Sequence, residues 1–81
     1  MTDQEILAKL QTILQETFEI DPERVQPDTN LFADLDLDSI DAVDLAIQLQ
    51  KLTGKRIQPQ DFKEVRTVAD VIGSVRRLLA A

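Results

Sequence analysis

Hydrophobic residues near the amino terminus recur every three or four positions, which is the spacing of one face of an α-helix. They are Ile6, Leu10, Ile13, Leu14 and Phe18. Thr2 and Glu5 match a capping box, in which a hydroxyl and a carboxylate accept the first free amides of a helix. We therefore predict a first helix from about Asp3 to Thr17.

A second set of hydrophobic residues with helical spacing lies at the end of the chain. It consists of Val68, Val71, Ile72, Val75, Leu78 and Leu79. Thr67 and Asp70 form another capping-box-like start, so the stripe predicts a helix that begins there and continues to the carboxyl terminus. Gly73 lies inside this helix at a cost of about 1 kcal/mol relative to alanine. A close helix crossing at that position would explain the glycine.

The most apolar helical stretch lies between these two and predicts a helix from Ser39 to about Thr53, with Gly54 as its stop. The wider of its two apolar sides suits a core. That side carries Ala42, Leu45, Ala46, Leu49 and Leu52. The opposite side carries Ile40, Val43 and Ile47, flanked by Asp44 and Lys51. We expect this second side to be an exposed docking surface, unless the preceding loop covers it.

A long connection from about Glu19 to Asp38 precedes that helix. Pro22 and Pro27 lack backbone donors, so we expect no regular element through them. Four apolar residues in the connection need burial, which predicts a loop packed against the core: Leu31, Phe32, Leu35 and Leu37. A short helix of one or two turns is predicted from Pro59 to Val65. The expected fold is all-α: a small four-helix bundle with three main helices, one short helix and a long loop between the first and second.

Composition narrows the possible functions. The chain of 81 residues contains neither cysteine nor histidine, so it lacks a disulfide, a thiolate and the side chain best suited to proton transfer near neutral pH. We therefore expect one domain, residues 1–81, that is not an enzyme. The amino terminus lacks the pattern of a secretory signal, and no apolar run is long enough to span a membrane. A cytoplasmic protein without stable membrane insertion is expected.

Charge is unevenly distributed along the chain. Residues 1–50 carry 12 acidic and 2 basic side chains, whereas residues 51–81 carry 3 acidic and 7 basic, which together give the net charge of -6. The acidic first part argues against nucleic acid as the main ligand, because phosphates would be repelled. It favours partner proteins with basic docking surfaces.

Ser39 stands at the centre of the acidic part. The acids around it, with no basic residue between them, are Asp34, Asp36, Asp38, Asp41 and Asp44. Asp38 can cap the helix with Ser39 in its first turn, where the dipole and free amides tolerate a phosphodiester. The alternative interpretation is that Asp38 and Ser39 only cap the helix and that nothing is attached to the serine. A calcium loop is not expected, because its sixth and twelfth positions are Ser39 and Leu45 instead of glycine and glutamate. No metal site is predicted.

Two runs of residues carry a resemblance to a known family over nearly the whole chain. The first is Leu31-Phe32-Ala33-Asp34-Leu35, Asp38-Ser39-Ile40-Asp41 and Val43-Asp44-Leu45. The second is Ile57-Gln58-Pro59, Asp61-Phe62 and Val65-Arg66-Thr67-Val68-Ala69-Asp70-Val71. Both resemble the acyl carrier proteins. The resemblance implies that Ser39, preceded by Asp38, carries 4'-phosphopantetheine, transferred from coenzyme A by a holo-carrier synthase, a phosphopantetheinyl transferase.

The resemblance also implies a function and a set of partners. The implied recognition helix presents Ile40, Asp41, Val43, Asp44 and Ile47 to docking enzymes. The resemblance further implies a monomer that holds acyl groups as thioesters on the 4'-phosphopantetheine arm. The monomer would present them to an acyl-loading ligase or transferase, a ketosynthase and related enzymes of fatty-acid, polyketide or related lipid synthesis.

Some positions depart from the family pattern. Fatty-acid carriers usually have a glycine near Asp36, where aspartate tolerates the same backbone angles better than most residues. Gln48, Gln50 and Lys51 replace acids late in the second helix. These departures favour a carrier for a specialised pathway at least as much as a housekeeping one. Two alternatives stay open: a peptidyl or aminoacyl carrier, and an unmodified helical adaptor that uses the Ile40–Ile47 side.

Overall fold

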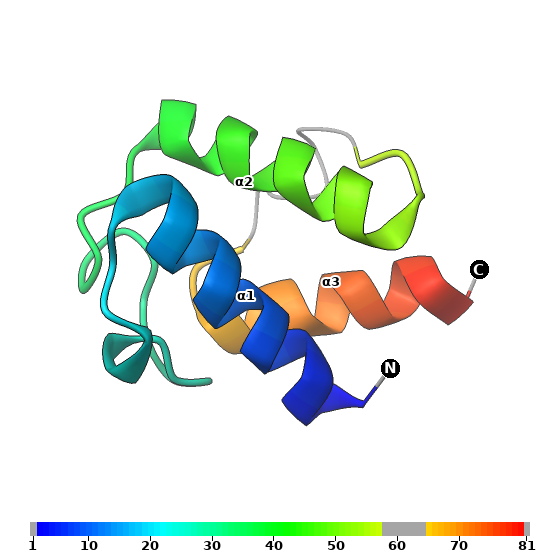
Figure 1. The fold of residues 1–81 in the computed structure, drawn as a ribbon, viewed down its shortest axis with the longest axis horizontal. Helices are drawn as coiled ribbons and strands as arrows, with labels where there is room; N and C mark the ends of the chain where they lie inside the picture. Colours follow the sequence, from blue (N-terminus) through cyan, green and yellow to red (C-terminus); the bar gives the residue numbers. More distant parts are fainter. Residues whose placement is uncertain (1, 58–64, 81) are drawn as a thin grey trace.

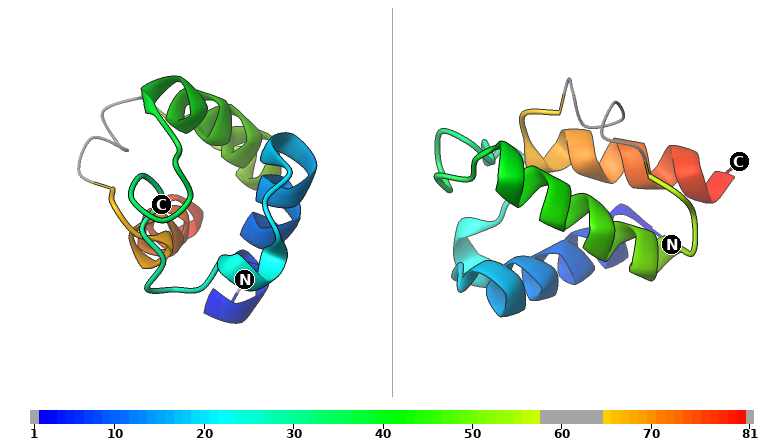
Figure 2. Two further views of the ribbon diagram at one scale, coloured as in Figure 1. Left: turned by 90° about the vertical axis from the view of Figure 1, so that its left-hand side faces the viewer. Right: turned by 90° about the horizontal axis from the view of Figure 1, so that it is seen from above.

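Three α-helices enclose one hydrophobic core in the computed structural model, which describes residues 2–57 and 65–80. Helix α1 spans Asp3–Phe18, α2 spans Ser39–Thr53 and α3 spans Val68–Ala80. Each helix packs against the other two. Figure 1 and the left view of Figure 2 show α2 above the pair α1 and α3, with the long loop closing one end of the bundle.

The helical fold class is confirmed for the described residues. Apart from one isolated β-bridge between Asn30 and Thr67, these residues contain no strand pairing. The short helix predicted from Pro59 falls in residues 58–64, outside the described part. At its end, Val65 is buried and non-helical. Within residues 2–57 and 65–80, no helix combines the length and the hydrophobicity needed to cross a lipid bilayer.

Local capping chemistry sets the helix starts. In α1, the Thr2 hydroxyl accepts the Glu5 amide at 3.2 Å, and the Glu5 carboxylate accepts the Thr2 amide at 3.1 Å. The hydrogen bond from the Thr2 amide to the Glu5 carboxylate holds the pKa of Glu5 below its usual value. At α3, the Asp70 carboxylate accepts the amides of Arg66 and Thr67, both at 3.0 Å, which likewise lowers the pKa of Asp70.

The core lies where the three predicted stripes meet. Its most fully buried side chains are Ile6, Leu10, Leu14, Val25, Leu45, Leu49, Val68, Val71 and Val75. On α2 the predicted core side is confirmed by the burial of Leu45, Ala46 and Leu49. Ala42 and Leu52, which belong to the same predicted side, lie half-buried at its edges.

The loop before α2 contains a regular element that the sequence analysis did not expect. A single 3-10 turn, η1, spans Pro22–Arg24. Our expectation was wrong here because Pro22 is the first residue of the turn, where the missing N–H has no partner to lose. The side-chain amide of Gln11 donates to the carbonyls of Pro22 and Val25, at 3.3 and 2.9 Å, and ties the turn to α1.

The loop is also bonded to the start of α3. The Leu31 amide donates to the Arg66 carbonyl at 2.8 Å, and the Val68 amide donates to the Thr29 carbonyl at 2.9 Å. Leu31, Leu35 and Leu37 are buried, while Phe32 is half-buried. The predicted packing of this loop against the core is therefore confirmed, and the loop holds the start of α2 in a defined place.

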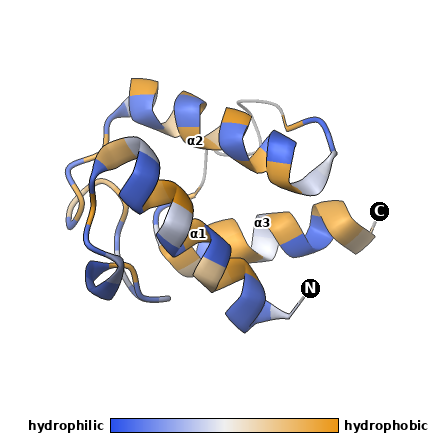
Figure 3. Ribbon diagram, viewed as in Figure 1, coloured by the Kyte–Doolittle hydropathy of each residue, from blue (hydrophilic) through white to orange (hydrophobic). Residues whose placement is uncertain are grey.

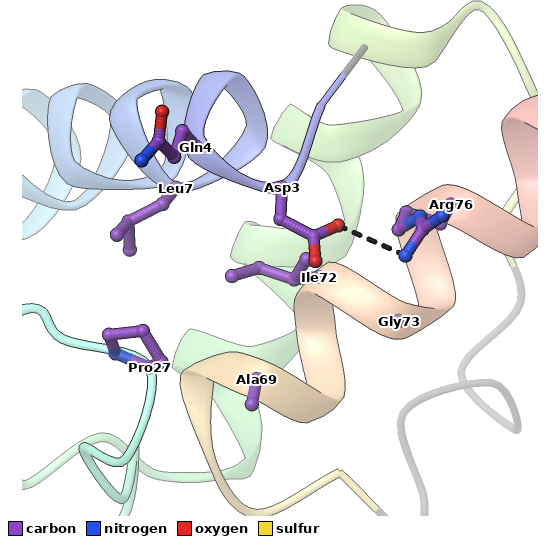
Figure 4. A pocket seen from close by; sticks show the side chains of 8 residues that line it. All are labelled: Asp3, Gln4, Leu7, Pro27, Ala69, Ile72, Gly73 and Arg76. Carbon is purple, nitrogen blue, oxygen red and sulfur yellow. Dashed lines mark ion pairs between the residues drawn. The ribbon is translucent and has the colours of Figure 1, made fainter.

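Gly73 does not lie at a helix crossing. A Cβ atom at this position would meet no neighbouring heavy atom within 4 Å, so the expectation of a close approach was wrong. The glycine instead lines a groove of about 250 Å³ between α1 and α3, together with Leu7, Pro27 and Ile72. Figure 4 shows the ion pair at its rim, where Arg76 lies 3.3 Å from the Asp3 carboxylate.

Candidate functional site: the serine at the start of α2

The chain reaches α2 through a turn with buried residues on both sides of an exposed aspartate. Leu35 and Leu37 are 7% and 8% exposed, and the Leu37 amide donates to the Leu31 carbonyl at 3.2 Å. Asp36 between them has a φ of +57°, in the left-handed region where glycine is favoured and aspartate is tolerated. The two leucines thus anchor the turn, and the backbone at Asp36 lets the chain change direction into the helix.

A reciprocal capping box begins α2. The Asp38 carboxylate accepts the Asp41 amide at 2.9 Å, and the Asp41 carboxylate accepts the Asp38 amide at 3.2 Å. Ser39 is the first helical residue, and its side chain is exposed. The amides of Ser39 and Ile40 belong to the first turn, whose N–H groups have no acceptor within the helix. A negatively charged group on Ser39 would therefore meet free donors and the positive end of the helix dipole.

The two serines of the chain have opposite environments. Ser74 lies within α3, is only 6% exposed, and its hydroxyl accepts a hydrogen bond from Arg77 at 3.2 Å. Ser39 is open to solvent at the end of the bundle. Of the two hydroxyls, only that of Ser39 can be reached by an enzyme without unfolding the protein. An exposed hydroxyl at a helix start fits a covalently attached phosphodiester.

An apolar strip on α2 lies beside Ser39 on the solvent side. We call it the outer strip; it consists of Ile40, Val43 and Ile47, which are 74%, 49% and 43% exposed. The predicted facing of α2 is confirmed, and the alternative in which the loop covers the strip is wrong. In Figure 3, hydrophobic bands follow the outer edge of α2 as well as the side that faces the other helices. Such a surface next to an accessible hydroxyl is typical of a protein docking site.

The acids near Ser39 divide into two groups. Asp34, Asp38 and Asp41 each accept a nearby backbone amide through their carboxylates, which shapes the loop and the helix start. Asp41 is half-buried, whereas Asp36 and Asp44 are exposed. Local structure thus accounts for three of the acids, and Asp36 and Asp44 present their charge to solvent. Within the part of the chain that the structure describes, no group of three or more acidic residues is arranged to hold a metal ion.

One contact at the site was missed by the sequence analysis. Arg24 of η1 donates a hydrogen bond to the carbonyl of Asp34 at 2.6 Å, and so braces the loop beneath the helix start. Its guanidinium also places a positive charge at the base of the acidic region. Ten residues separate the pair, and no local motif signals such a contact.

Comparisons with known proteins agree with this geometry. Residues 8–75 match the family model described as "Phosphopantetheine attachment site". Acyl carrier protein 2 of Ralstonia nicotianae is 64% identical over 81 residues, covering the whole of both chains. The chain belongs to the acyl carrier protein family. Members of this family carry covalently attached 4'-phosphopantetheine.

More distant acyl carrier proteins share the sequence pattern and the fold. The meromycolate extension acyl carrier protein of Mycolicibacterium smegmatis is 36% identical over 77 residues, which cover 95% of this chain and 78% of that one. The crystal structure of an acyl carrier protein from Thermotoga maritima superimposes with a TM-score of 0.85 at 29% identity. The match covers 96% of this chain and 91% of that one. The helical carrier fold and the carrier function are therefore confirmed.

Proposed function

We propose that Ser39 is the attachment site and that the chain carries acyl intermediates for fatty-acid or related lipid-synthesis enzymes. The observation that carries this proposal is the exposed Ser39 hydroxyl at the capped start of α2, inside the region that matches the phosphopantetheine attachment family. When attached, the 4'-phosphopantetheine arm supplies a terminal thiol that holds an acyl group as a thioester. The chain itself supplies no catalytic group.

The residues around Ser39 position the arm for its partners. The Asp38–Asp41 cap and the buried Leu37 hold the helix start in place, so that the attachment point stays beside the outer strip. An enzyme that docks on Ile40 and Val43 then has the arm within reach of its entrance. The exposed carboxylate of Asp44 attracts basic docking surfaces and raises the rate of encounter.

The same surface serves several enzymes in turn. We propose the holo-carrier synthase, an acyl-loading ligase or transferase and a ketosynthase as successive partners. The names of the relatives support an acyl cargo over an aminoacyl cargo, since those described above are named as acyl carriers. The name of the Mycolicibacterium protein refers to meromycolate extension. We therefore place this chain in lipid assembly, with a specialised pathway favoured at least as much as a housekeeping one.

A short or medium acyl chain is proposed to fold back into the bundle beneath α2. Ala46 is buried on the core side and Ala42 lies half-buried at its edge, and both side chains are small. Around them, Leu45 and Leu49 provide an aliphatic lining. Each buried CH₂ group would contribute about 0.8 kcal/mol. Burial would also keep water and unrelated enzymes away from the thioester.

Intact-mass analysis tests the assignment of Ser39. The wild-type chain is incubated with coenzyme A and a broad-specificity phosphopantetheinyl transferase, and we expect the mass of one pantetheine phosphate to be added. Ser39→Ala should show no addition, whereas the matched Ser74→Ala variant should be labelled like the wild type. Labelling that survives in Ser39→Ala would contradict the assignment. An absence of labelling in the wild type would favour the unmodified adaptor.

A further inference from the structure

The charge on α2 changes sign along the helix. Its first half carries Asp41 and Asp44, following the cap residue Asp38, and its last turn carries Lys51. Lys55 and Arg56 then follow the helix in the chain, and all three basic side chains are exposed. In Figure 1 this end of α2 lies at the opposite end of the bundle from the long loop that leads to Ser39. The surface around α2 therefore has an acidic end and a basic end.

Helix geometry places Lys51 in line with the outer strip. Asp44, Ile47 and Lys51 follow one another at spacings of three and four residues, so their side chains lie along the same face. Lys51 lies twelve residues beyond Ser39, which corresponds to about 18 Å at the rise of an α-helix. This separation exceeds the Debye length of roughly 8–10 Å at physiological salt. A docked protein would therefore experience the two ends as separate local fields.

The basic end has a defined structure. The Gly54 amide donates to the Gln50 carbonyl at 2.8 Å, and Gly54 closes α2 in the left-handed conformation. The Ile57 amide donates to the side-chain oxygen of Gln50, also at 2.8 Å, and Ile57 is buried. Lys55 and Arg56 therefore stand on a turn that is anchored on both sides. Both residues lie within five positions of Lys51 in the chain.

We propose that Lys51, supported by Lys55 and Arg56, determines which enzymes accept this carrier. The inference rests on the proposed function and specifies its partners. A matching enzyme has basic residues near the entrance for the arm and an acidic patch about 18 Å away that pairs with Lys51. An enzyme whose docking surface is basic throughout meets like charge at Lys51 and is rejected. The outer strip supplies apolar contact in both cases, so the basic end provides the discrimination.

A simpler role for Lys51 is stabilisation of α2 itself. A cation in the last turn complements the helix dipole, and that contribution would exist without any partner. The two roles give different results in a kinetic experiment. A purely structural role changes the thermal midpoint of Lys51 variants and leaves their use by a given enzyme unchanged. A docking role changes KM with that enzyme.

The test uses a ketosynthase that is chosen because its docking surface is basic throughout. Wild type, Lys51→Glu and Lys51→Gln are loaded from octanoyl-coenzyme A by the broad-specificity phosphopantetheinyl transferase. Intact-mass analysis verifies the loading. Lys9→Glu is the matched control, because Lys9 is an exposed lysine on α1 and the charge change is the same. Thermal midpoints establish that each variant is folded.

We expect Lys51→Glu to raise kcat/KM with this ketosynthase about tenfold, mainly through a lower KM, and Lys51→Gln to give a smaller gain. Added salt should reduce the gain, and Lys9→Glu should match the wild type. Equal kcat/KM for loaded wild type and Lys51→Glu would overturn the inference, as would an equal gain in Lys9→Glu. If the wild-type chain cannot be loaded at all, the proposed function fails instead, and the two failures are thereby distinguished.

Discussion

The starts of α2 and α3 use similar local chemistry in different surroundings. At α3, the Asp70 carboxylate accepts two amides, and the loop carbonyls of Thr29 and Pro27 accept the amides of Val68 and Ala69. At α2, Asp38 accepts the amide of Asp41, and the neighbouring Ile40 is 74% exposed. At the start of α3 the helix amides already donate to loop carbonyls, whereas the first amides of α2 stay accessible.

This comparison shows what makes a capped helix start available for function. Capping sequences are common, and they stabilise helices whether or not anything binds there. The start of α3 cannot take a phosphodiester, because protein carbonyls already accept its amides. The start of α2 can, because the loop ends at its cap and packs elsewhere. Accessibility, decided by the path of the loop, separates the proposed attachment site at α2 from the purely structural helix start at α3.

The largest expected effect compares the covered and open sides of α2. Leu49→Ala should lower the free energy of unfolding by about 2–5 kcal/mol, because Leu49 is fully buried and its truncation leaves a cavity. Ile47→Glu should stay within about 0.5 kcal/mol, because Ile47 is exposed. Chemical denaturation measures both. The reverse order would mean that the facing of α2 is wrong.

Modification of Ser39 and partner binding should instead be more sensitive to substitutions in the outer strip, which change stability little. Val43→Glu and Ile47→Glu should slow modification of Ser39 or weaken partner binding, because they place charge in the outer strip. Labelling rates with coenzyme A and a transferase provide the measurement. Lys9→Glu on α1 is the control for added negative charge, and it should be labelled at the wild-type rate. Unchanged labelling and partner binding in both strip variants would contradict a docking role.

Removal of the caps should have an intermediate effect on stability at both helix starts. Asp38→Ala and Asp70→Ala should each lower the unfolding free energy by about 1 kcal/mol, since the first removes the acceptor of the Asp41 amide and the second removes the acceptor of the amides of Arg66 and Thr67. Only Asp38→Ala should also slow labelling of Ser39, because it loosens the start of α2. Equal labelling rates in the two variants would show that the cap of α2 does not position the serine.

The length of the attached acyl chain tests whether the chain is buried against the core side of α2, with a smaller free-energy change for each added CH₂ group. The thermal midpoint should rise as the attached chain is lengthened, corresponding to about 0.8 kcal/mol for each CH₂ group that is buried. The rise should end when the available space beneath α2 is full. Replacing the small Ala46 by leucine should occupy part of that space, so the midpoint should stop rising at a shorter acyl chain. A midpoint that is independent of chain length would indicate that the chain is carried outside the bundle.

The smallest expected effect concerns pH and the start of α3. Hydrogen bonds from Thr67 and Arg66 lower the pKa of Asp70 in the folded state. A lowered folded pKa contributes stability that is present above the unfolded value and is lost as pH falls through the folded value. Asp70→Asn should therefore flatten the decline in unfolding free energy below about pH 4. Parallel pH profiles for wild type and variant would contradict this contribution.

Local sequence was sufficient to predict the three α-helices and the exposure of the candidate site. The capping pairs Thr2–Glu5 and Asp38–Asp41 and the stop at Gly54 lie within a few residues of the ends that they determine, so α1 and α2 were predicted almost residue by residue. The exposure of Ile40 followed from helical periodicity and the position of the core side. Ser39 was identifiable because a hydroxyl, a cap and a family motif coincide there.

Tertiary structure alone decided how the loop is used. The bonds from Leu31 to Arg66 and from Val68 to Thr29 join segments more than thirty residues apart, and no local pattern encodes them. For the same reason, the groove beside Gly73 and the burial of Ser74 could not be predicted from α3 by itself. Capping and periodicity act over one or two helical turns. Coverage of a helix start depends on where a distant segment packs, and that is determined only when the whole chain has folded.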